Sequence, residues 1–330
     1  MGKESTTLIE NTLRKELIMK QLFKKVTSIA LLSALVLTGC AGGGNNAAKD
    51  NAAENNAAKN NAAAQKTDEK KDGQVVKIGV VGDDQRLWEK AKENAEKDGV
   101  TLDIVVFNDY NTPNDALANG DIDLNAFQHK AFLDDYNEAK KQNLVPIGMT
   151  YLSPIGVYSD KIKDLKELKD GAKIAIPNDA TNGGRALIVL EQAGVITLKD
   201  DAGLVPTVKD IKDNPKNVTI DELDASQVAR SLPDVDAAVI NGNMAVDAKL
   251  DPRKDPIFVE AMGESIAPYI NYVVARAEDK DNELYKKVVS YYQQDNVDEL
   301  LQELYKGSQY AAWKLDLKDL NQYGEAKDAK

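Results

Sequence analysis

Short apolar runs alternate with amphipathic stretches through most of the chain, and this alternation limits the folds that it can adopt. The expected strands are 75–81, 102–107, 122–126 and 145–158, the last broken by Pro146 and Pro154, and the expected helices are 84–97, 112–118 and 130–141. Strands that alternate with helices favour parallel pairing in a sheet that helices cover on both faces. The sequence therefore predicts the α/β class.

A second, similar series begins after the turn at 161–165. Its expected strands are 172–176, 219–220, 237–240 and 269–275, and its expected helices are 185–193 and 226–232, with more helix toward the C-terminus. Two series predict two lobes: 75–154 plus 272–330 form lobe 1, and 155–271 form lobe 2. The chain crosses near 152–158 and 266–275, which predicts a hinge of two crossover segments and a ligand cleft between the lobes.

The first part of the chain differs in kind from the rest. Residues 1–18 precede Met19 and are interpreted as an upstream extension, whereas 19–39 have the basic start and apolar run of a secretory signal peptide. The apolar run is shorter than the roughly 20 residues of a membrane span. Leu37-Thr38-Gly39-Cys40 resembles the bacterial lipobox, which implies a lipid on Cys40. We expect a protein anchored to the cell membrane on its extracytoplasmic side.

Residues 40–73 comprise Cys40 and a linker of Gly, Asn, Ala and Lys repeats without large apolar residues, which predicts a flexible tether. Cys40 is the only cysteine, so the body has no disulfide framework and no cysteine-based metal site. The net charge is −12, and no basic stripe is interleaved with aromatic residues. Nucleic acid is therefore not an expected partner.

The motifs of common catalytic sites are absent from the sequence. His129 is the only histidine, and no Gly-x-Ser-x-Gly elbow, P-loop or dinucleotide fingerprint occurs. The ligands of a zinc site are missing as well. We therefore expect no enzyme, no cofactor and no metal; a hydrolase that depends on His129 is a remote alternative.

The stretch 174–191 combines a short apolar strand, a break at Pro177 and a helix expected to start near Thr181 or Asn182. Arg185 would then lie in the first helical turn, where free backbone N–H groups and the helix dipole favour an anion. A guanidinium can hold a carboxylate by two hydrogen bonds. The alternative is a surface arginine paired to a neighbour.

Aromatic and polar residues follow several predicted strands. Phe107 and Tyr110 end one strand, and Phe127 and His129 end the next; carboxyl ends of strands face the ligand crevice of α/β lobes. These aromatic rings can line an apolar slot, and a neutral imidazole can donate one hydrogen bond. The alternatives are core packing for the phenylalanines and a satisfied, half-buried ring for His129.

Two asparagines occupy similar positions. Asn241 ends the strand 237–240, and Asn271 lies inside an otherwise apolar strand. A buried amide is costly unless it is hydrogen-bonded, so we expect these side chains to face a partner. The alternative is bonding to neighbouring backbone only.

The chain resembles the substrate-binding lipoproteins of methionine ABC importers, the NlpA/MetQ family. The matching segments are 76–80, 123–129, 154–159, 177–179, 184–187, 239–241 and 269–271, spread in order over residues 75–313. The resemblance implies a two-lobed type II periplasmic-binding-protein fold that closes on methionine and works with an ABC importer permease. It further implies that Arg185 holds the ligand carboxylate and that Asn241 and Asn271 fix the amino-acid backbone.

The resemblance also implies that His129 adds a polar contact and that Phe107, Tyr110 and Phe127 wall the thioether pocket. Asn182, in the segment 181–184, is expected to face the ligand. This segment and 241–243 depart from the usual family pattern. D-methionine, a methionine-containing dipeptide and another small apolar amino acid therefore stay open as ligands. A surface adhesion or interaction lipoprotein that kept the fold is a further alternative.

Overall fold

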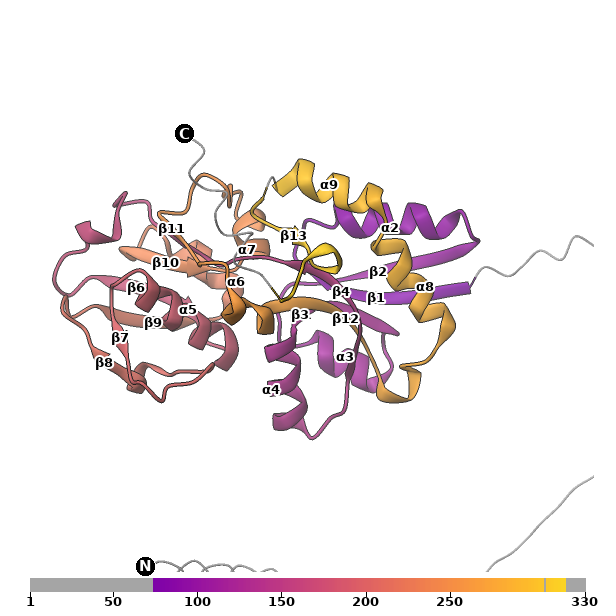
Figure 1. Ribbon diagram of the computed structural model, residues 1–330, viewed down its shortest axis with the longest axis horizontal. Coiled ribbons are helices and arrows are strands. Elements are labelled where there is room, and N and C mark those ends of the chain that lie inside the picture. Colours follow the sequence, from indigo (N-terminus) through magenta and orange to yellow (C-terminus); the bar gives the residue numbers. More distant parts are fainter. Residues whose placement is uncertain (1–73, 306, 319–330) are drawn as a thin grey trace, which may run out of the picture. The chain divides into compact units, whose positions relative to one another are not determined.

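The computed structural model describes residues 74–305 and 307–318, all within the compact unit Asp68–Lys330. The extension at 1–18, the signal peptide at 19–39, Cys40 and the linker to residue 73 lie outside the described residues, as do residues 319–330 of the predicted lobe 1. Two mixed sheets with helices on both faces make up the described part (Figure 1). The predicted α/β class is confirmed.

The first sheet has six strands in the order β13-β4-β12-β3-β1-β2. They are β1 (Gln74–Val81), β2 (Val100–Phe107), β3 (Leu124–His129), β4 (Val145–Leu152), β12 (Ile270–Ala275) and β13 (Tyr310–Ala311). β1 runs parallel to β2 and β3, but β12 runs antiparallel to both β3 and β4. The expectation of a parallel sheet is confirmed for β1, β2 and β3 and is wrong for β12 and β13, because β12 arrives from the other sheet without a returning α-helix.

Helices cover both faces of this sheet. On one face lie α2 (Arg86–Glu96), α8 (Glu283–Tyr292) and α9 (Asp295–Tyr305), and on the other lie α3 (Pro113–Asn119) and α4 (Lys130–Lys140) (Figure 1). Trp88 of α2 packs on Tyr292 of α8 with ring centroids 4.5 Å apart. We call this sheet and its helices lobe 1.

The second sheet has five strands in the order β11-β5-β10-β6-β9, and we call it and its helices lobe 2. The strands are β5 (Gly156–Tyr158), β6 (Lys173–Pro177), β9 (Thr219–Leu223), β10 (Ala237–Ile240) and β11 (Phe258–Val259). β5 and β11 are antiparallel to their neighbours. A small hairpin of β7 (Thr197–Leu198) and β8 (Ile211–Asp213) lies apart from this sheet.

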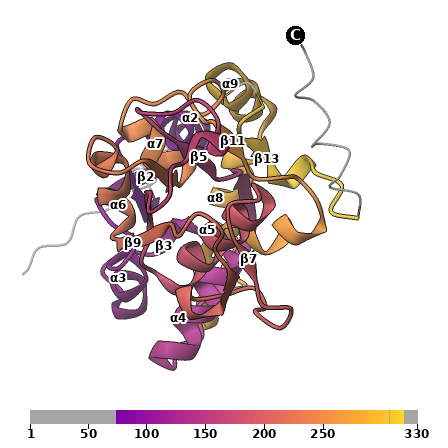
Figure 2. The same cartoon turned by 90° about the vertical axis from the view of Figure 1, so that its left-hand side faces the viewer.

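One face of the second sheet packs against α5 (Ala180–Gln192), and the other packs against α6 (Ala225–Val228) and α7 (Gly242–Asp247). The helix α4 of lobe 1 contacts α5 of lobe 2 (Figure 2). Short 3₁₀ helices occur at η1 (Leu165–Glu167), η2 (Val208–Asp210), η3 (Ala229–Ser231), η4 (Glu264–Tyr269), η5 (Ala277–Asp279) and η6 (Ala312–Lys314).

Two segments join the lobes. The chain passes from β4 to β5 through Ser153, Pro154 and Ile155, and it returns from β11 to β12 through η4. These are the two crossover segments that the sequence predicts. Because β12 begins at Ile270, the predicted boundary between residues 271 and 272 falls inside this strand. Both crossovers adjoin the site described next.

Candidate functional site

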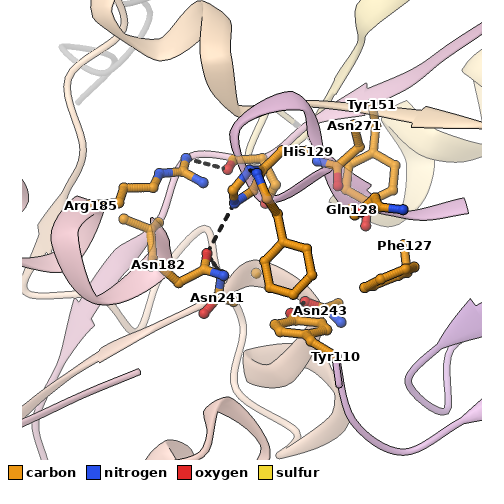
Figure 3. A pocket seen from close by; sticks show the side chains of 14 residues that line it. Tyr110, Phe127, Gln128, His129, Tyr151, Asn182, Arg185, Asn241, Asn243 and Asn271 are labelled. Atoms are coloured by element: carbon orange, nitrogen blue, oxygen red, sulfur yellow. Dashed lines mark hydrogen bonds between the residues drawn. The ribbon is translucent and has the colours of Figure 1, made fainter. Parts of the chain in front are cut away.

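A hollow of about 430 Å³, counting the space that opens to solvent, lies between the two sheets. Its size falls in the range of small-molecule sites. It is lined by Tyr110, Phe127, Gln128, His129, Phe132, Tyr151, Ser153, Ile155, Asn182, Arg185, Asn241, Gly242, Asn243 and Asn271 (Figure 3). The structure thus brings together seven of the eight residues predicted as ligand-binding.

Lobe 1 supplies the aromatic wall of the hollow. Phe127 and Phe132 pack edge to face with ring centroids 5.8 Å apart, and Tyr110 packs at a tilt on Phe127 with centroids 6.0 Å apart. Tyr151 of β4 extends this wall toward the crossover (Figure 3). Such a slot of rings suits an apolar side chain.

Phe107 is the predicted residue that does not line the hollow. It ends β2 and packs in the core beside Phe127 and Ile122, where its ring also meets the bare backbone of Gly79. A Cβ at Gly79 would lie 2.9 Å from this ring, so the packing there is tight. This position favours the core-packing alternative over a direct contact with a ligand.

The helix α5 begins one to two residues earlier than predicted. Asp179 caps it by accepting a hydrogen bond of 2.8 Å from the backbone N–H of Asn182, so neither Thr181 nor Asn182 is the cap. Asn182 instead turns its side chain toward the hollow. Arg185 is therefore not in the first helical turn, and its predicted position beside the free N–H groups at the helix start is wrong.

Glycine at 183 and 184 allows close approach within the protein itself. A Cβ on Gly183 would lie 2.7 Å from the Pro177 carbonyl oxygen, and one on Gly184 would lie 2.8 Å from the Val205 Cα. Neither glycine is among the residues that line the hollow. The two glycines let the preceding strand end and the loop at 205–206 pack on α5.

Arg185 is held by a carboxylate that the sequence analysis missed. Its Nε donates to both oxygens of Glu260 at 2.9 and 3.2 Å, and its Nη2 donates to Glu260 Oε2 and to the Ser153 carbonyl oxygen. The guanidinium carbon lies 4.2 Å from the Tyr269 ring centroid, a cation–π contact. Within the described part of the chain, Nη1 has no hydrogen-bond partner and is the guanidinium group left for a ligand.

Glu260 joins the arginine to the first crossover. Its Oε2 accepts a hydrogen bond of 3.1 Å from the backbone N–H of Ile155, and its side chain is only 4 % exposed. The sequence signal was an acidic residue directly after the apolar run Ile257–Val259, at the end of β11. A carboxylate in that position needs a buried partner.

Amide groups continue the polar wall on lobe 2. Asn182 Oδ1 accepts a hydrogen bond of 2.7 Å from Asn241 Nδ2 and lies 3.2 Å from His129 Nε2. Asn182 Nδ2 in turn donates to the Asp179 carboxylate at 3.0 and 3.1 Å. Figure 3 shows Arg185, Asn182 and Asn241 together on the side of the hollow opposite Phe127. A chain of polar groups therefore fixes this wall.

His129 is neutral, and both of its ring nitrogens bond within the protein. Its Nδ1 accepts from the backbone N–H of Phe132 at 3.1 Å, so Nε2 carries the proton that points to Asn182 Oδ1. Burial, helped by the Arg185 charge, lowers the pKa of His129 to about 3. The geometry thus gives His129 a role in orienting Asn182 and matches the alternative of a satisfied ring.

Two amides in the hollow have unused hydrogen-bonding capacity. Asn241 Oδ1 is buried with no partner among the residues that the structure describes. Asn271 pairs in register with His129 across β12 and β3, and its amide makes one long bond of 3.4 Å to the Tyr269 carbonyl oxygen. Buried polar atoms are almost always hydrogen-bonded in proteins, so these two amides are available to bind a ligand.

A direct contact joins the lobes at the aromatic end. The Tyr110 hydroxyl donates a hydrogen bond of 2.6 Å to Asn243 Oδ1 in α7. Burial raises the pKa of Tyr110, so the hydroxyl stays protonated and remains a donor. In the sequence, Asn243 is recognisable only as part of the unusual segment 241–243. Four further residues that line the hollow were not predicted, although they adjoin predicted residues or the crossover: Gln128, Phe132, Tyr151 and Ser153.

The arrangement offers complementary groups for an amino acid. One free guanidinium nitrogen suits a carboxylate, amide oxygens suit an ammonium group, and the aromatic slot suits an apolar side chain. Residues 74–305 and 307–318 contain no group of three or more His, Cys, Asp or Glu side chains that could hold a metal ion. The guanidinium, amide and aromatic groups of the hollow together have the chemistry of a binding pocket.

The family model described as NlpA lipoprotein matches residues 76–313. The chain belongs to the NlpA lipoprotein family. The D-methionine-binding lipoprotein MetQ of Salmonella typhimurium is 47% identical to it over 249 residues, which cover 74% of this chain and 91% of that protein. The predicted family resemblance is confirmed, and the relatives that this chain resembles are named as lipoproteins.

Solved structures of similar sequence share the fold of this chain. A nutrient binding protein from Burkholderia cenocepacia, bound to methionine, is 46% identical with a TM-score of 0.69, covering 72% of this chain and 99% of that chain. The substrate binding protein of a methionine transporter from Streptococcus pneumoniae is 41% identical with a TM-score of 0.69, covering 72% and 96%. The NlpA lipoprotein thus has the two-lobed α/β fold of substrate-binding proteins. Among its described helices, none combines the length and the apolar character that a membrane crossing requires.

Proposed function

We propose that this NlpA lipoprotein is a non-enzymatic receptor that captures methionine between its lobes and delivers it to an ABC importer. The observation that carries the proposal is the convergence of Arg185, Asn241 and Asn271 on one hollow that faces an aromatic slot. Relatives named for methionine binding and methionine transport support the same ligand class.

In this proposal Arg185 Nη1 binds the ligand carboxylate. The amide oxygens of Asn241 and Asn271 accept hydrogen bonds from the α-ammonium group, and the thioether enters the slot formed by Tyr110, Phe127 and Phe132. An apolar slot discriminates weakly between side chains that differ by one methylene, about 1–3 kcal/mol. We therefore expect both enantiomers of methionine and related apolar amino acids to compete, with methionine preferred.

The anchoring rests on the sequence. A lipid on Cys40 would hold the protein at the extracytoplasmic side of the cell membrane, and the linker to residue 73 would let the body reach the permease. Tethering raises the effective concentration of the receptor at the permease without any new contact. Cys40 and the linker lie outside the described residues.

Calorimetric titration of ligand-stripped protein tests the proposal. We expect 1:1 binding of L-methionine, with D-methionine, leucine and Gly-Met compared in the same cell. Asn241→Ala removes the amide oxygen that has no partner within the described residues and should weaken methionine binding about tenfold. The matched control Asn143→Ala changes an exposed asparagine in the turn after α4 and should leave the Kd unchanged. Absence of binding heat for every amino acid and for the dipeptide would refute the proposal.

A further inference from the structure

The hollow contains one charged lining residue, and its charge is already balanced. Of the side chains that line it, only Arg185 carries a charge, because His129 is neutral. Glu260 lies directly behind Arg185, and the two side chains are 4 % and 3 % exposed. Arg185 and Glu260 together therefore carry no net charge.

The buried pair cannot relax into solvent. Glu260 is fixed by Ile155 N–H on one side and by Arg185 on the other, and the Tyr269 ring covers the guanidinium. Screening by water is weak at such a site, so a net charge left in the closed hollow would be costly. The net charge of the Arg185–Glu260 pair therefore contributes to the binding free energy of every ligand that the hollow encloses.

No carboxylate lines the hollow to pair with a ligand ammonium group. Asp179 lies behind Asn182 and accepts hydrogen bonds from its amide and from its backbone N–H. The groups left for an ammonium are neutral amide oxygens such as Asn241 Oδ1. A ligand without net charge keeps the hollow neutral, whereas an anion or a cation with the same side chain leaves one charge unbalanced.

We propose that Glu260 determines the charge specificity of this receptor: by neutralising Arg185 it makes the closed hollow select zwitterions over anions that carry the same side chain. The inference rests on the proposed binding of methionine-type amino acids. Glu260 acts through Arg185 and does not touch the ligand, so it is a positioning and specificity-determining residue. An arginine without this partner would attract any small carboxylate.

Three ligands with a thioether side chain and different net charge test the inference by calorimetry at pH 6. They are 4-(methylthio)butanoate, which is an anion, methionine, which is a zwitterion, and methioninamide, which is a cation at this pH. The readout is the ratio of the Kd values within each variant. A purely structural defect would weaken all three ligands together and leave the ratios unchanged.

Two variants shift the charge of the hollow in opposite directions. Glu260→Gln keeps a hydrogen-bond acceptor beside Arg185 but makes the hollow positive, and it should move the anion-to-methionine preference toward the anion by about tenfold or more. Asn243→Asp keeps the acceptor for the Tyr110 hydroxyl but makes the hollow negative. We expect Asn243→Asp to weaken the binding of the anion relative to methionine and to strengthen the binding of methioninamide relative to methionine.

Two further variants serve as controls. Glu260→Asp retains the charge and should keep the wild-type preference even if all affinities fall. Glu222→Gln removes a carboxylate from the exposed side of β9 and should leave every Kd unchanged.

Unchanged ratios in Glu260→Gln and Asn243→Asp would overturn the inference, as would a shift in Glu260→Asp as large as in Glu260→Gln. If Glu260→Gln does not fold, the direction of the shift in Asn243→Asp decides alone. If the wild-type protein binds methionine but the Kd ratios do not change with the charge of the hollow, only this inference is refuted. Wild-type protein that binds none of the three ligands refutes the proposed function.

Discussion

Replacing Arg185 by methionine tests how much its buried ion pair with Glu260 contributes to the free energy of unfolding. The substitution removes the hydrogen bonds from Nε and Nη2 to Glu260 and the bond of 2.9 Å to the Ser153 carbonyl oxygen. It leaves Glu260, which is 4 % exposed, buried without its cation. Breaking such a pair from one side costs about 3–5 kcal/mol, and the lost contact with the Tyr269 ring adds about 0.5–2 kcal/mol. We expect the free energy of unfolding to fall by at least about 3 kcal/mol.

The double variant Arg185→Met/Glu260→Met removes both charges, and it tests whether the lost stability comes from leaving Glu260 without its partner. Apolar side chains of similar size often replace a buried pair at no net cost, so the double variant should regain most of the lost stability. Urea unfolding of ligand-free protein, followed by circular dichroism, measures both. Arg230→Met, at an exposed position on η3, is the control and should change stability by about 0.5 kcal/mol or less. A loss below 1 kcal/mol in Arg185→Met, or a double variant no more stable than it, would refute the reasoning.

Two further predictions concern lobe 1. Because burial lowers the pKa of His129 to about 3 from an ordinary 6.5, the unfolded chain binds more protons between these values, and stability falls as the pH falls through that window. His129→Gln should flatten the curve of unfolding free energy against pH there, and curves that stay parallel would contradict this. Tyr110→Phe removes the bond of 2.6 Å to Asn243 across the lobes. It should weaken methionine binding about 2- to 10-fold with little change in stability; an unchanged Kd would count against an interlobe role.

Much of the fold could be predicted from local patterns. Alternating strands and helices identify the class, and Pro154 marks the first crossover because a proline interrupts the strand ladder. The direction of β12 could not be predicted, since it depends on the partner strands, β3 and β4, that the returning chain meets. Strand pairing is a long-range property that no local spacing contains.

The site was predictable where strand ends carry unusual side chains. Asn271 in an apolar strand and Asn241 after another indicated polar groups in a cleft, and both line the hollow. The role of Glu260 was not predictable, because its partner Arg185 is 75 residues away in the sequence. The cap of α5 was misassigned because Asp179, Thr181 and Asn182 are all good capping residues, and only the backbone shows which one is used.

The division of the hollow between the lobes has a consequence for how ligand preference can change. Every ring of the slot (Tyr110, Phe127, Phe132 and Tyr151) belongs to lobe 1, whereas Arg185 and Asn241 belong to lobe 2. In the proposed binding mode, Arg185 and Asn241 of lobe 2, together with Asn271 of β12, hold the groups common to all α-amino acids, and the rings of lobe 1 contact the variable side chain. Redesign for a different amino acid can therefore be confined to the aromatic side chains within residues 110–151. The residues that hold the carboxylate and ammonium groups of the ligand then stay unchanged.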